Sequence, residues 1–242
     1  LQNIQTELQR QELEAWQNLT RVLRHEIMNS ITPISSLTST LREILDHDLT
    51  RVNEHYELKN EGAEDLREGL NTIESRSRGL IKFIDAYREY TSLPQPNFKV
   101  IKVKDLLSKV ESLMRNEIRK TKVAFKVNMV EDFLTIEADE EMIEQVLINL
   151  VKNALEACQE TKDPKVELHA GHKDENVVIQ VIDNGPGIIR EALDKVFVPF
   201  FSTKATGSGI GLSLSRQILQ LHNGSLSVDS IPNVKTVFTL KF

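Results

Sequence analysis

The apolar residues in the first part of the chain recur at the spacing of α-helices. Up to about residue 47 they follow steps of three and four, and this first stripe comprises Leu13, Trp16, Leu19, Leu23, Ile27, Ile31, Ile34, Leu37, Leu41 and Leu45. After a polar stretch at about 48–62, a second stripe alternates steps of four and three and comprises Leu66, Leu70, Ile73, Ser77, Leu80, Ile84 and Tyr87. Such spacing places the apolar side chains on one helix face. The pattern therefore predicts two long helices.

Two helices with narrow apolar stripes cannot bury both of their flanks within one hairpin. Alternating steps of four and three form the seam of a coiled coil or a helical bundle. The sequence therefore predicts an all-α hairpin that pairs with a second copy as a homodimeric four-helix bundle. Pro33 lies inside the first helix, where it removes one backbone hydrogen bond and is expected to bend the helix.

The segment 92–97 contains two prolines, which end the second helix and stiffen a short linker. We place the domain boundary there, giving a helical domain at 1–95 and a second domain at 96–242. Beyond the prolines the pattern becomes mixed α/β. Helices are predicted at 103–120, 140–158 and 209–222, and strands at 124–129, 134–137, 165–170, 177–183, 225–230 and 234–241. This mixture predicts an α/β sandwich.

Composition narrows the class of protein. The 242 residues suffice for two modest domains, and a net charge of -6 offers no basic field for nucleic acid. No apolar run approaches the roughly 18 to 20 residues of a membrane span. The chain starts with Leu1, already inside a helical pattern, which is typical of a piece of a longer protein. A sensor or membrane segment upstream is compatible with this start.

The cysteine and histidine content excludes several kinds of metal and disulfide site. Cys158 is the only cysteine, so disulfide frameworks and cysteine metal sites are excluded, and a reducing, cytoplasmic compartment is favoured. His169 and His172 have no partner at a metal-ligand spacing, and we interpret them as surface residues.

His25, Glu26 and Asn29 lie within about one turn of the first predicted helix. His25 is two residues from both Leu23 and Ile27, so it faces away from the apolar stripe, and Asn29 shares its face. A neutral imidazole is a competent nucleophile near pH 7. Taken alone, however, the segment also fits an ordinary solvated or core histidine.

Two polar motifs in the second domain fit a bound cation and a ligand. Asn149 and Asn153 are four residues apart on one helix face, where amide oxygens suit a Mg²⁺ that takes most of its ligands from water and phosphate. Asp183 follows an apolar strand, and Gly185 and Gly187 allow a ligand to approach the backbone. The alternatives are a solvated helix face and an ordinary turn.

Two further motifs follow along the chain. Residues 197–204 set three aromatic residues, including Phe200, ahead of Lys204, although core packing of the phenylalanines is the simpler interpretation. Three glycines then precede the helix predicted at 209–222, namely Gly207, Gly209 and Gly211. The free N–H groups and the positive dipole end of that helix suit an anionic phosphate.

In this order, the four motifs resemble the N, G1, F and G2 boxes of the Bergerat ATP-binding fold, and residues 24–29 resemble an H-box. Nearly the whole chain thus resembles the dimerisation and catalytic core of a two-component sensor histidine kinase. The resemblance implies that Asn153 coordinates Mg²⁺, with Asn149 near the phosphates, and that Asp183 accepts a hydrogen bond from the adenine amino group. It also implies that Gly185 and Gly187 shape the adenine pocket and that residues 197–204, which include Phe200 and Lys204, form a lid over ATP. The phosphate end would be held by Gly207, Gly209 and Gly211.

The implied activity is ATP-dependent autophosphorylation of His25, followed by transfer to an aspartate of a response regulator. Glu26 would orient the imidazole, and Asn29 would position a water for dephosphorylating the regulator. Hydrolytic relatives usually carry a glutamate where this chain has Asn149, which favours transfer over hydrolysis. The chain departs from the common pattern at Ser30, where many H-boxes have proline, and at Ala205–Thr206, where Pro-Gly is frequent.

Two other functions fit the same motifs. One is a dimeric regulatory scaffold that binds ATP without kinase activity. The other is a Bergerat-fold protein kinase that acts on a serine substrate and does not need His25.

Overall fold

The computed structural model describes residues 2–131, 133–202 and 209–242, with the backbone alone described for 2–19 and for Asn60. The chain divides into two compact units, Leu1–Glu89 and Tyr90–Phe242. The proline segment at 92–97 belongs to the second unit. None of the described helices is both long and apolar enough to cross a lipid bilayer.

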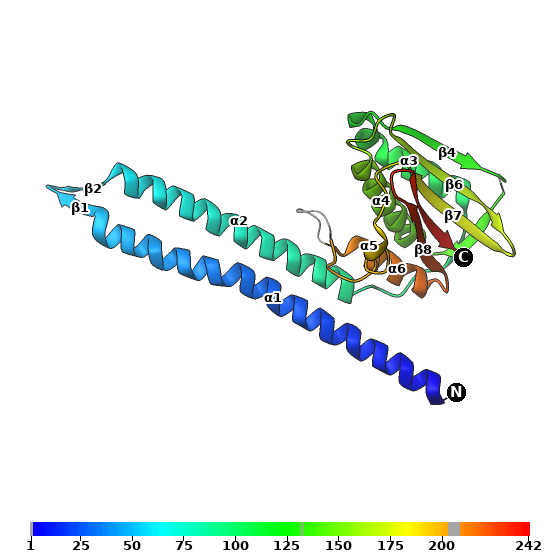
Figure 1. Cartoon of the computed structure of the whole chain (residues 1–242), viewed down its shortest axis with the longest axis horizontal. Helices are drawn as coiled ribbons and strands as arrows, with labels where there is room; N and C mark the ends of the chain where they lie inside the picture. Colours follow the sequence, from blue (N-terminus) through cyan, green and yellow to red (C-terminus); the bar gives the residue numbers. More distant parts are fainter. Residues whose placement is uncertain (1, 132, 203–208) are drawn as a thin grey trace. The chain divides into compact units, whose positions relative to one another are not determined.

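The first unit is a helical hairpin of α1 (Gln2–Asp48) and α2 (Asn60–Thr91) (Figure 1). α1 continues through Pro33. The sequence pattern did not predict the small β-hairpin between them, formed by β1 (Leu49–Val52) and β2 (His55–Leu58). Its register pairs the residues that flank a turn in which Asn53 has φ 55°, a left-handed conformation that asparagine tolerates well. This turn has a polar sequence, so no hydrophobic pattern reveals it.

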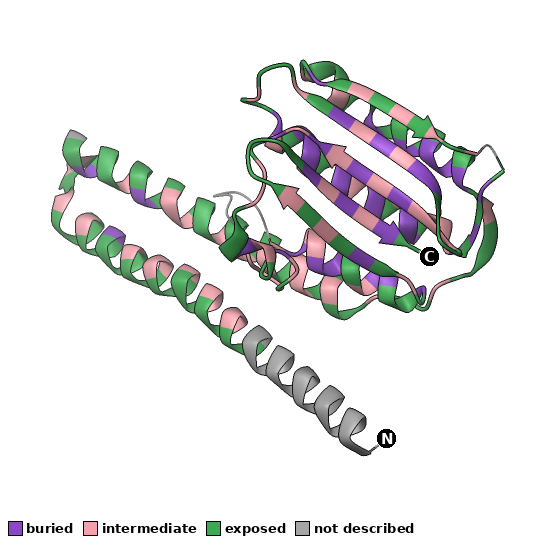
Figure 2. Cartoon of the chain, turned by 45° about the vertical axis from the view of Figure 1, so that its right-hand side comes forward, coloured by how far each residue is buried: buried purple, intermediate pink, exposed green. Residues whose placement is uncertain are grey.

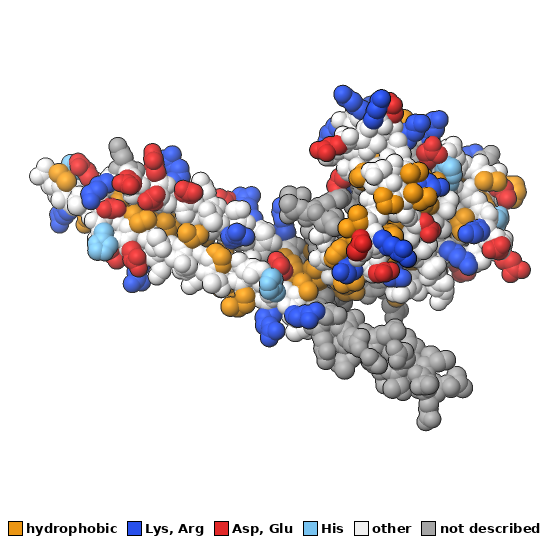
Figure 3. Space-filling view, viewed as in Figure 1, with side chains coloured by type: hydrophobic (Ala, Val, Ile, Leu, Met, Phe, Trp, Pro, Cys, Tyr) orange, Lys and Arg blue, Asp and Glu red, His pale blue; other side chains and the backbone are white. Residues whose placement is uncertain are grey.

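Small residues on α2 allow the two helices to approach closely. A Cβ atom on Gly69 would lie 2.6 Å from Cδ2 of Leu41, which is only 8% exposed. Next to the β-hairpin, a Cβ atom on Gly62 would lie 3.0 Å from Oδ2 of Asp48. The hairpin nevertheless leaves large apolar side chains exposed, and Figure 3 shows hydrophobic groups following its length. Those that are at least 41% exposed on the helices are Met28, Ile31, Leu45, Leu70, Ile81 and Ile84.

The second unit is built on a five-stranded sheet with the order β4-β6-β7-β9-β8. The strands are β4 (Ala124–Met129), β6 (Lys165–Lys173), β7 (Asn176–Asp183), β9 (Lys235–Lys241) and β8 (Ser225–Ile231). β4 runs parallel to β6, and the other neighbours are antiparallel. One face of the sheet carries the helices α3 (Val103–Lys120), α4 (Glu140–Ala157) and α6 (Gly211–Leu221) (Figure 2). The predicted α/β fold is confirmed, and the predicted elements agree with these bounds to within a few residues.

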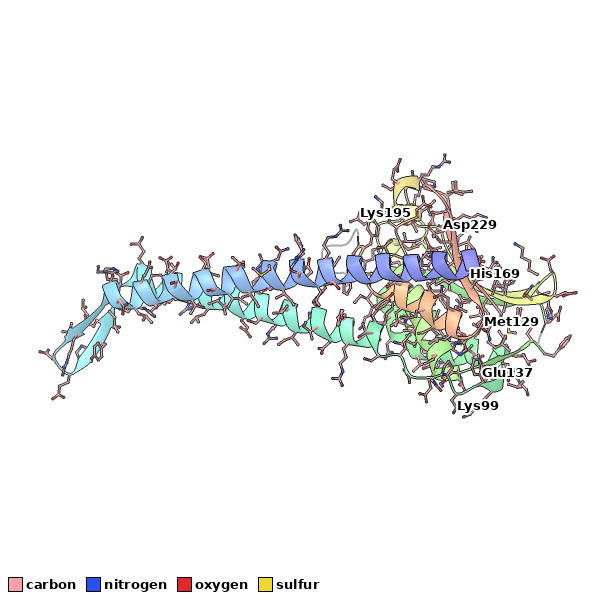
Figure 4. All side chains as sticks on the ribbon, turned by 90° about the horizontal axis from the view of Figure 1, so that it is seen from below. Lys99, Met129, Glu137, His169, Lys195 and Asp229 are labelled. Atoms are coloured by element: carbon pink, nitrogen blue, oxygen red, sulfur yellow. The ribbon has the colours of Figure 1, made fainter. Side chains whose placement is uncertain are left out.

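Two short elements of this unit were not predicted. β3 (Lys99–Lys102) pairs with β5 (Thr135–Ala138) in a separate two-stranded sheet, which carries the Lys99 and Glu137 labelled in Figure 4. The side chain of Val100 is 75% exposed, so β3 lacks a clear apolar alternation. The second element is the single turn α5 (Arg190–Leu193), which lies within the predicted loop.

The core lies between the sheet and its three helices. Side chains that are less than 2% exposed come from α3, α4, α6 and the inward positions of the strands, and include Leu106, Leu107, Ile143, Leu147, Leu150, Leu168, Ile179, Ile218, Leu219 and Leu240. Burying a side chain of this size contributes about 1.5–3 kcal/mol. This core therefore fixes α4 and α6, the helices that carry most of the candidate nucleotide site.

The two histidines of β6 lie on the surface, as predicted. Nε2 of His169, labelled in Figure 4, is 2.7 Å from Oε2 of Glu167, and Nδ1 of His172 is 3.3 Å from Oε2 of Glu131. In the described part of the chain, no three His, Cys, Asp or Glu side chains gather as a metal site.

Candidate functional site

The His25 side chain is exposed on α1, with 71% of its surface accessible. Its Nδ1 lies 3.0 Å from the amide nitrogen Nδ2 of Asn29 and 3.5 Å from Oε1 of Glu26. The three residues thus come together as the helical spacing indicates. Both Asn29 and Glu26 contact Nδ1. Which of them bonds to Nδ1 decides whether Nε2 carries the ring proton or a lone pair.

The amide of Asn29 can set the tautomer of His25. In the orientation observed, Nδ2 can only donate, so Nδ1 accepts the bond and the proton of the neutral ring lies on Nε2. Turning the amide by 180° would place its oxygen against Nδ1–H, and Nε2 would then keep a lone pair. Glu26 can accept the same Nδ1 proton, although 3.5 Å is the longer contact. Either acceptor would make Nε2 the nucleophilic atom.

Asn149 joins α4 to the start of α6. Its Nδ2 donates a hydrogen bond of 2.9 Å to Oγ of Ser215, and a Cβ atom on Gly211 would collide with its Oδ1. Asn149 therefore lies against the third glycine of the predicted phosphate segment. The contact with Ser215 was not predicted, since nothing in the sequence pairs two residues on separate helices.

Asn153 lies one turn further along α4 and is partly exposed. Mg²⁺ bound to a nucleotide takes most of its ligands from water and phosphate, so one amide oxygen is a sufficient protein ligand. The polar residues in this part of α4 fit that role.

Asp183 ends β7 and is only 3% exposed. Its Oδ1 accepts a hydrogen bond of 2.9 Å from the backbone N–H of Gly185. Burial raises the pKa of this carboxyl to about 6, against the lowering effect of the Gly185 bond. A carboxylate can accept up to four hydrogen bonds, so Asp183 retains capacity for a donor on a ligand.

The loop after Asp183 is fastened to the β8–β9 hairpin. The N–H of Ile188 donates to Oγ of Ser230 at 2.9 Å, and the N–H of Asn233 donates to the carbonyl of Pro186 at 2.8 Å. Gly187 has φ 77°, and a Cβ atom there would lie 2.9 Å from Cα of Pro232. Glycine is therefore required at this position by both conformation and space.

Asn184 is a structural residue that the motif alone did not identify. Its Oδ1 accepts a hydrogen bond of 2.6 Å from the N–H of Lys165, and its Nδ2 donates to the carbonyl of Asp163 at 3.0 Å. These bonds fix the loop to the start of β6. An asparagine before glycine indicates only a turn, so the sequence holds no signal for this cross-strand role.

A backbone hydrogen bond joins the described residues on the two sides of positions 203–208. The N–H of Phe200 donates to the carbonyl of Gly209 at 2.9 Å, with φ 65° at Phe200 and 68° at Gly209. A Cβ atom on Gly209 would lie 2.5 Å from the carbonyl carbon of Phe200, which excludes a side chain there. Lys204 and Gly207 were predicted to belong to this site and lie outside the described residues.

The beginning of α6 suits an anion. Gly211 is its first residue, and within the described part of the chain no side chain caps its first turn. Uncapped N–H groups at a helix N-terminus attract phosphate. Nearby, the ring of Phe197 packs edge-on against Phe238, with a centroid separation of 6.4 Å, and beneath the guanidinium of Arg216 at 4.6 Å. Phe197 thus takes the packing role, which was the simpler interpretation of these aromatics.

Comparisons with known proteins agree with this geometry. Residues 138–242 match the family described as histidine kinase-, DNA gyrase B-, and HSP90-like ATPase. The chain is 26% identical over 216 residues to signal transduction histidine-protein kinase AtoS of Escherichia coli (strain K12), covering 89% of this chain and 33% of that protein. It is 27% identical over 231 residues to sensor histidine kinase ZraS of Salmonella typhimurium (strain LT2), covering 96% of this chain and 46% of that protein.

Solved structures show the same relationship. The catalytic domain of histidine kinase ThkA is 34% identical with a TM-score of 0.55, and the match covers 60% of this chain and 95% of that domain. ThkA in complex with response regulator protein TrrA gives a TM-score of 0.66 at 26% identity, covering 96% of this chain and 63% of that one. The chain spans between about a third and a half of the two curated relatives. It belongs to the sensor histidine kinases, and residues 138–242 are its ATPase-family domain.

Proposed function

We propose that this chain is the catalytic core of a sensor histidine kinase that phosphorylates its own His25 from ATP and passes the phosphoryl group to an aspartate of a response-regulator receiver domain. The observation that carries the proposal is the exposed imidazole whose Nδ1 is held by Asn29 at 3.0 Å. With Nδ1 engaged, Nε2 is the ring nitrogen left for a reaction partner, and it has a lone pair when Glu26 or the turned amide of Asn29 accepts the proton on Nδ1. The nucleotide-binding family of the second unit supplies the phosphoryl donor.

Each residue of the nucleotide site has a distinct task in this reaction. Asp183 accepts a hydrogen bond from the adenine amino group, and the first turn of α6 faces the phosphates. Asn153 would hold Mg²⁺, which would supply positive charge to the phosphate oxygens. Nε2 of His25 forms a bond to the γ-phosphorus as the bond from that phosphorus to the bridging oxygen breaks, releasing ADP. Glu26 or Asn29 takes the hydrogen bond from Nδ1–H as the ring becomes positively charged.

The absence of a general base at position 149 supports transfer over hydrolysis. An asparagine amide does not accept a proton from water near pH 7, and the amide of Asn149 is engaged with Ser215 at 2.9 Å. Water near ATP is therefore not activated at position 149, and phosphoryl transfer needs a nucleophile stronger than water. His25 provides one.

Asn29 supports a second activity, dephosphorylation of the regulator. It lies one turn from His25 on the same exposed face, so a receiver domain docked for transfer presents its phospho-aspartate to the same amide. Asn29→Ala is expected to slow this dephosphorylation by roughly tenfold or more, the scale of a lost positioning contact of 1.4 kcal/mol, while autophosphorylation persists. Release of phosphate from a purified phosphorylated regulator measures it.

Asn29→Thr is the matched control, because it keeps a polar hydrogen-bonding group at the same position. It should retain more dephosphorylating activity than the alanine variant. Equal rates for the parent and Asn29→Ala would show that Asn29 takes no part.

The exposed stripe of the hairpin supports a homodimer, in which the helical domain carries both dimerisation and phosphotransfer. Leu70 is 58% exposed and Ile84, two heptads later, is 41% exposed. We expect the chain to have twice its mass of 27.6 kDa in solution, and Leu70→Glu to shift it toward the monomer, because a charge cannot be buried unpaired in the seam. Light scattering at micromolar concentration measures the mass.

Asn71→Glu adds the same charge on the same turn but off the stripe, so it should remain dimeric. A parent chain that is already monomeric under these conditions would refute the four-helix bundle.

A further inference from the structure

Asp139 makes more contacts than a helix cap needs. It precedes α4, and its Oδ1 accepts hydrogen bonds from the N–H groups of Glu141 at 3.1 Å and Met142 at 3.2 Å. This is the ordinary task of an N-cap aspartate. Its Oδ2 and its own N–H are not needed for that task, yet both are bonded to distant parts of the chain.

The first of these distant contacts reaches the linker from the helical hairpin. The backbone N–H of Asn97 donates to Oδ2 of Asp139 at 2.8 Å. This bond is the main cause that holds the pKa of the Asp139 carboxyl below its usual value. The linker is thus tied by its backbone to the first residue before α4.

The second contact reaches the end of α6. The N–H of Asp139 donates to Nε2 of His222 at 3.0 Å, and Nδ1 of His222 lies 2.7 Å from the carbonyl of Ile218. A carbonyl can only accept, so Nδ1 carries the proton and Nε2 is the acceptor. The ring is 6% exposed and lies 5.1 Å from the ring of Phe98, next to Asn97. The His222 ring therefore contacts the linker, the residue before α4 and the last turn of α6.

The same two helices meet again at the nucleotide end. Asn149, about ten residues or 15 Å along α4, contacts Ser215 and Gly211 of α6. The distance along α6 from His222 back to Gly211 is about 16 Å, so the two helices run side by side between matching contacts. Packed helices tend to move as rigid bodies, so a shift of α4 against α6 at the linker end would also displace their contacts at the nucleotide end.

We propose that Asp139 and His222 form a linker latch, a pair of positioning residues through which residues 97 and 98 set the relative position of α4 and α6 and thereby the affinity for ATP. The inference rests on the proposed nucleotide-binding function. In this arrangement the linker acts, through Asp139 and His222, on the two helices that carry Asn149, Asn153 and Gly211.

A pair of substitutions at Asn97 tests the latch in the full 242-residue chain. Asn97→Pro removes the N–H that bonds Asp139, while Asn97→Ala keeps it. ATP affinity, measured by calorimetry with Mg²⁺, should fall about fivefold or more in the proline variant, the lower range of allosteric couplings, and stay at the parent value in the alanine variant. His222→Phe keeps an aromatic ring beside Phe98 but removes the nitrogen that accepts the bond from the Asp139 N–H. It should weaken ATP binding to a similar extent.

Non-additivity and reciprocity separate the latch from a merely structural cap. The double variant Asn97→Pro, His222→Phe should bind ATP no more weakly than the worse single variant. In the parent, ATP should slow hydrogen exchange of the Asp139 amide, because coupling between two sites acts in both directions.

If the variants only lower the melting temperature, while ATP affinity and the exchange of the Asp139 amide stay unchanged, the latch is wrong. A parent chain that binds no ATP would refute the proposed function first, and the latch with it.

Discussion

His25→Gln is expected to abolish incorporation of the γ-phosphate into the chain while ATP affinity changes by less than about twofold. The glutamine side chain has no imidazole nitrogen to attack phosphorus, and the nucleotide site is built from other residues. The parent should acquire a label that is lost in acid and kept in base, as expected for phosphohistidine. Labelling with γ-labelled ATP and calorimetry on the same preparation measure both quantities.

His55→Gln provides the matched control for this experiment. His55 is also an exposed histidine with a glutamate beside it, since its Nε2 lies 3.1 Å from Oε1 of Glu57. Its substitution should leave labelling intact. Retained label in His25→Gln would refute His25 as the nucleophile. A parent that binds ATP without any label would favour the regulatory scaffold, and acid-stable label on another protein would favour a serine kinase.

Asp183→Asn is expected to weaken ATP binding by about 10- to 150-fold, the value of a hydrogen bond to a charged group. The carboxylate is the buried acceptor for the adenine amino group, and an amide offers a weaker acceptor in its place. Asp229→Asn, at an exposed carboxylate on β8 (Figure 4), should bind ATP like the parent. Unchanged affinity in Asp183→Asn would show that Asp183 is only a turn residue.

The raised pKa of Asp183 predicts opposite effects of pH on binding and on stability. Below about pH 6 the carboxyl is protonated, so the affinity of the parent should fall relative to Asp183→Asn, which corrects for titration of the ATP phosphates. The pKa of Asp183 in the folded chain lies above the ordinary carboxyl value of 3.8, so the folded state binds the proton more tightly and the free energy of unfolding should rise as pH falls through 6. The difference between these two pKa values corresponds to about 3 kcal/mol, by which the ionised carboxylate destabilises the folded chain at neutral pH. Because asparagine carries no charge, Asp183→Asn should not lower the melting temperature at neutral pH.

The sequence predicted the long elements well because their apolar stripes report directly on burial. α3 and β4 have the bounds that the pattern indicated, and α4 and α6 differ by only one or two residues at an end. β3 could not be found in this way, because it forms by pairing with β5 and leaves Val100 exposed. The turn at Asn53 depends likewise on local backbone geometry and not on an apolar pattern.

In the candidate site, contacts between residues close in sequence could be predicted, and contacts between residues far apart in sequence could not. The local order of His25, Glu26 and Asn29 predicted a shared helix face, and their side chains do meet there. The contact of Asn149 with Ser215 joins residues 66 positions apart, so it depends on how α4 and α6 pack. The assignment of roles to these residues stays a prediction that the substitutions above test.

The hydrogen bond between Phe200 and Gly209 has a consequence for protein engineering. It joins positions 200 and 209 directly, and both residues hold left-handed backbone conformations. The entropic cost of a closed loop grows only slowly with its length, by about 0.6 kcal/mol for each doubling. A segment of different length and sequence from another kinase can therefore be grafted between these two residues, and the chimaera should keep the sheet and its helices intact.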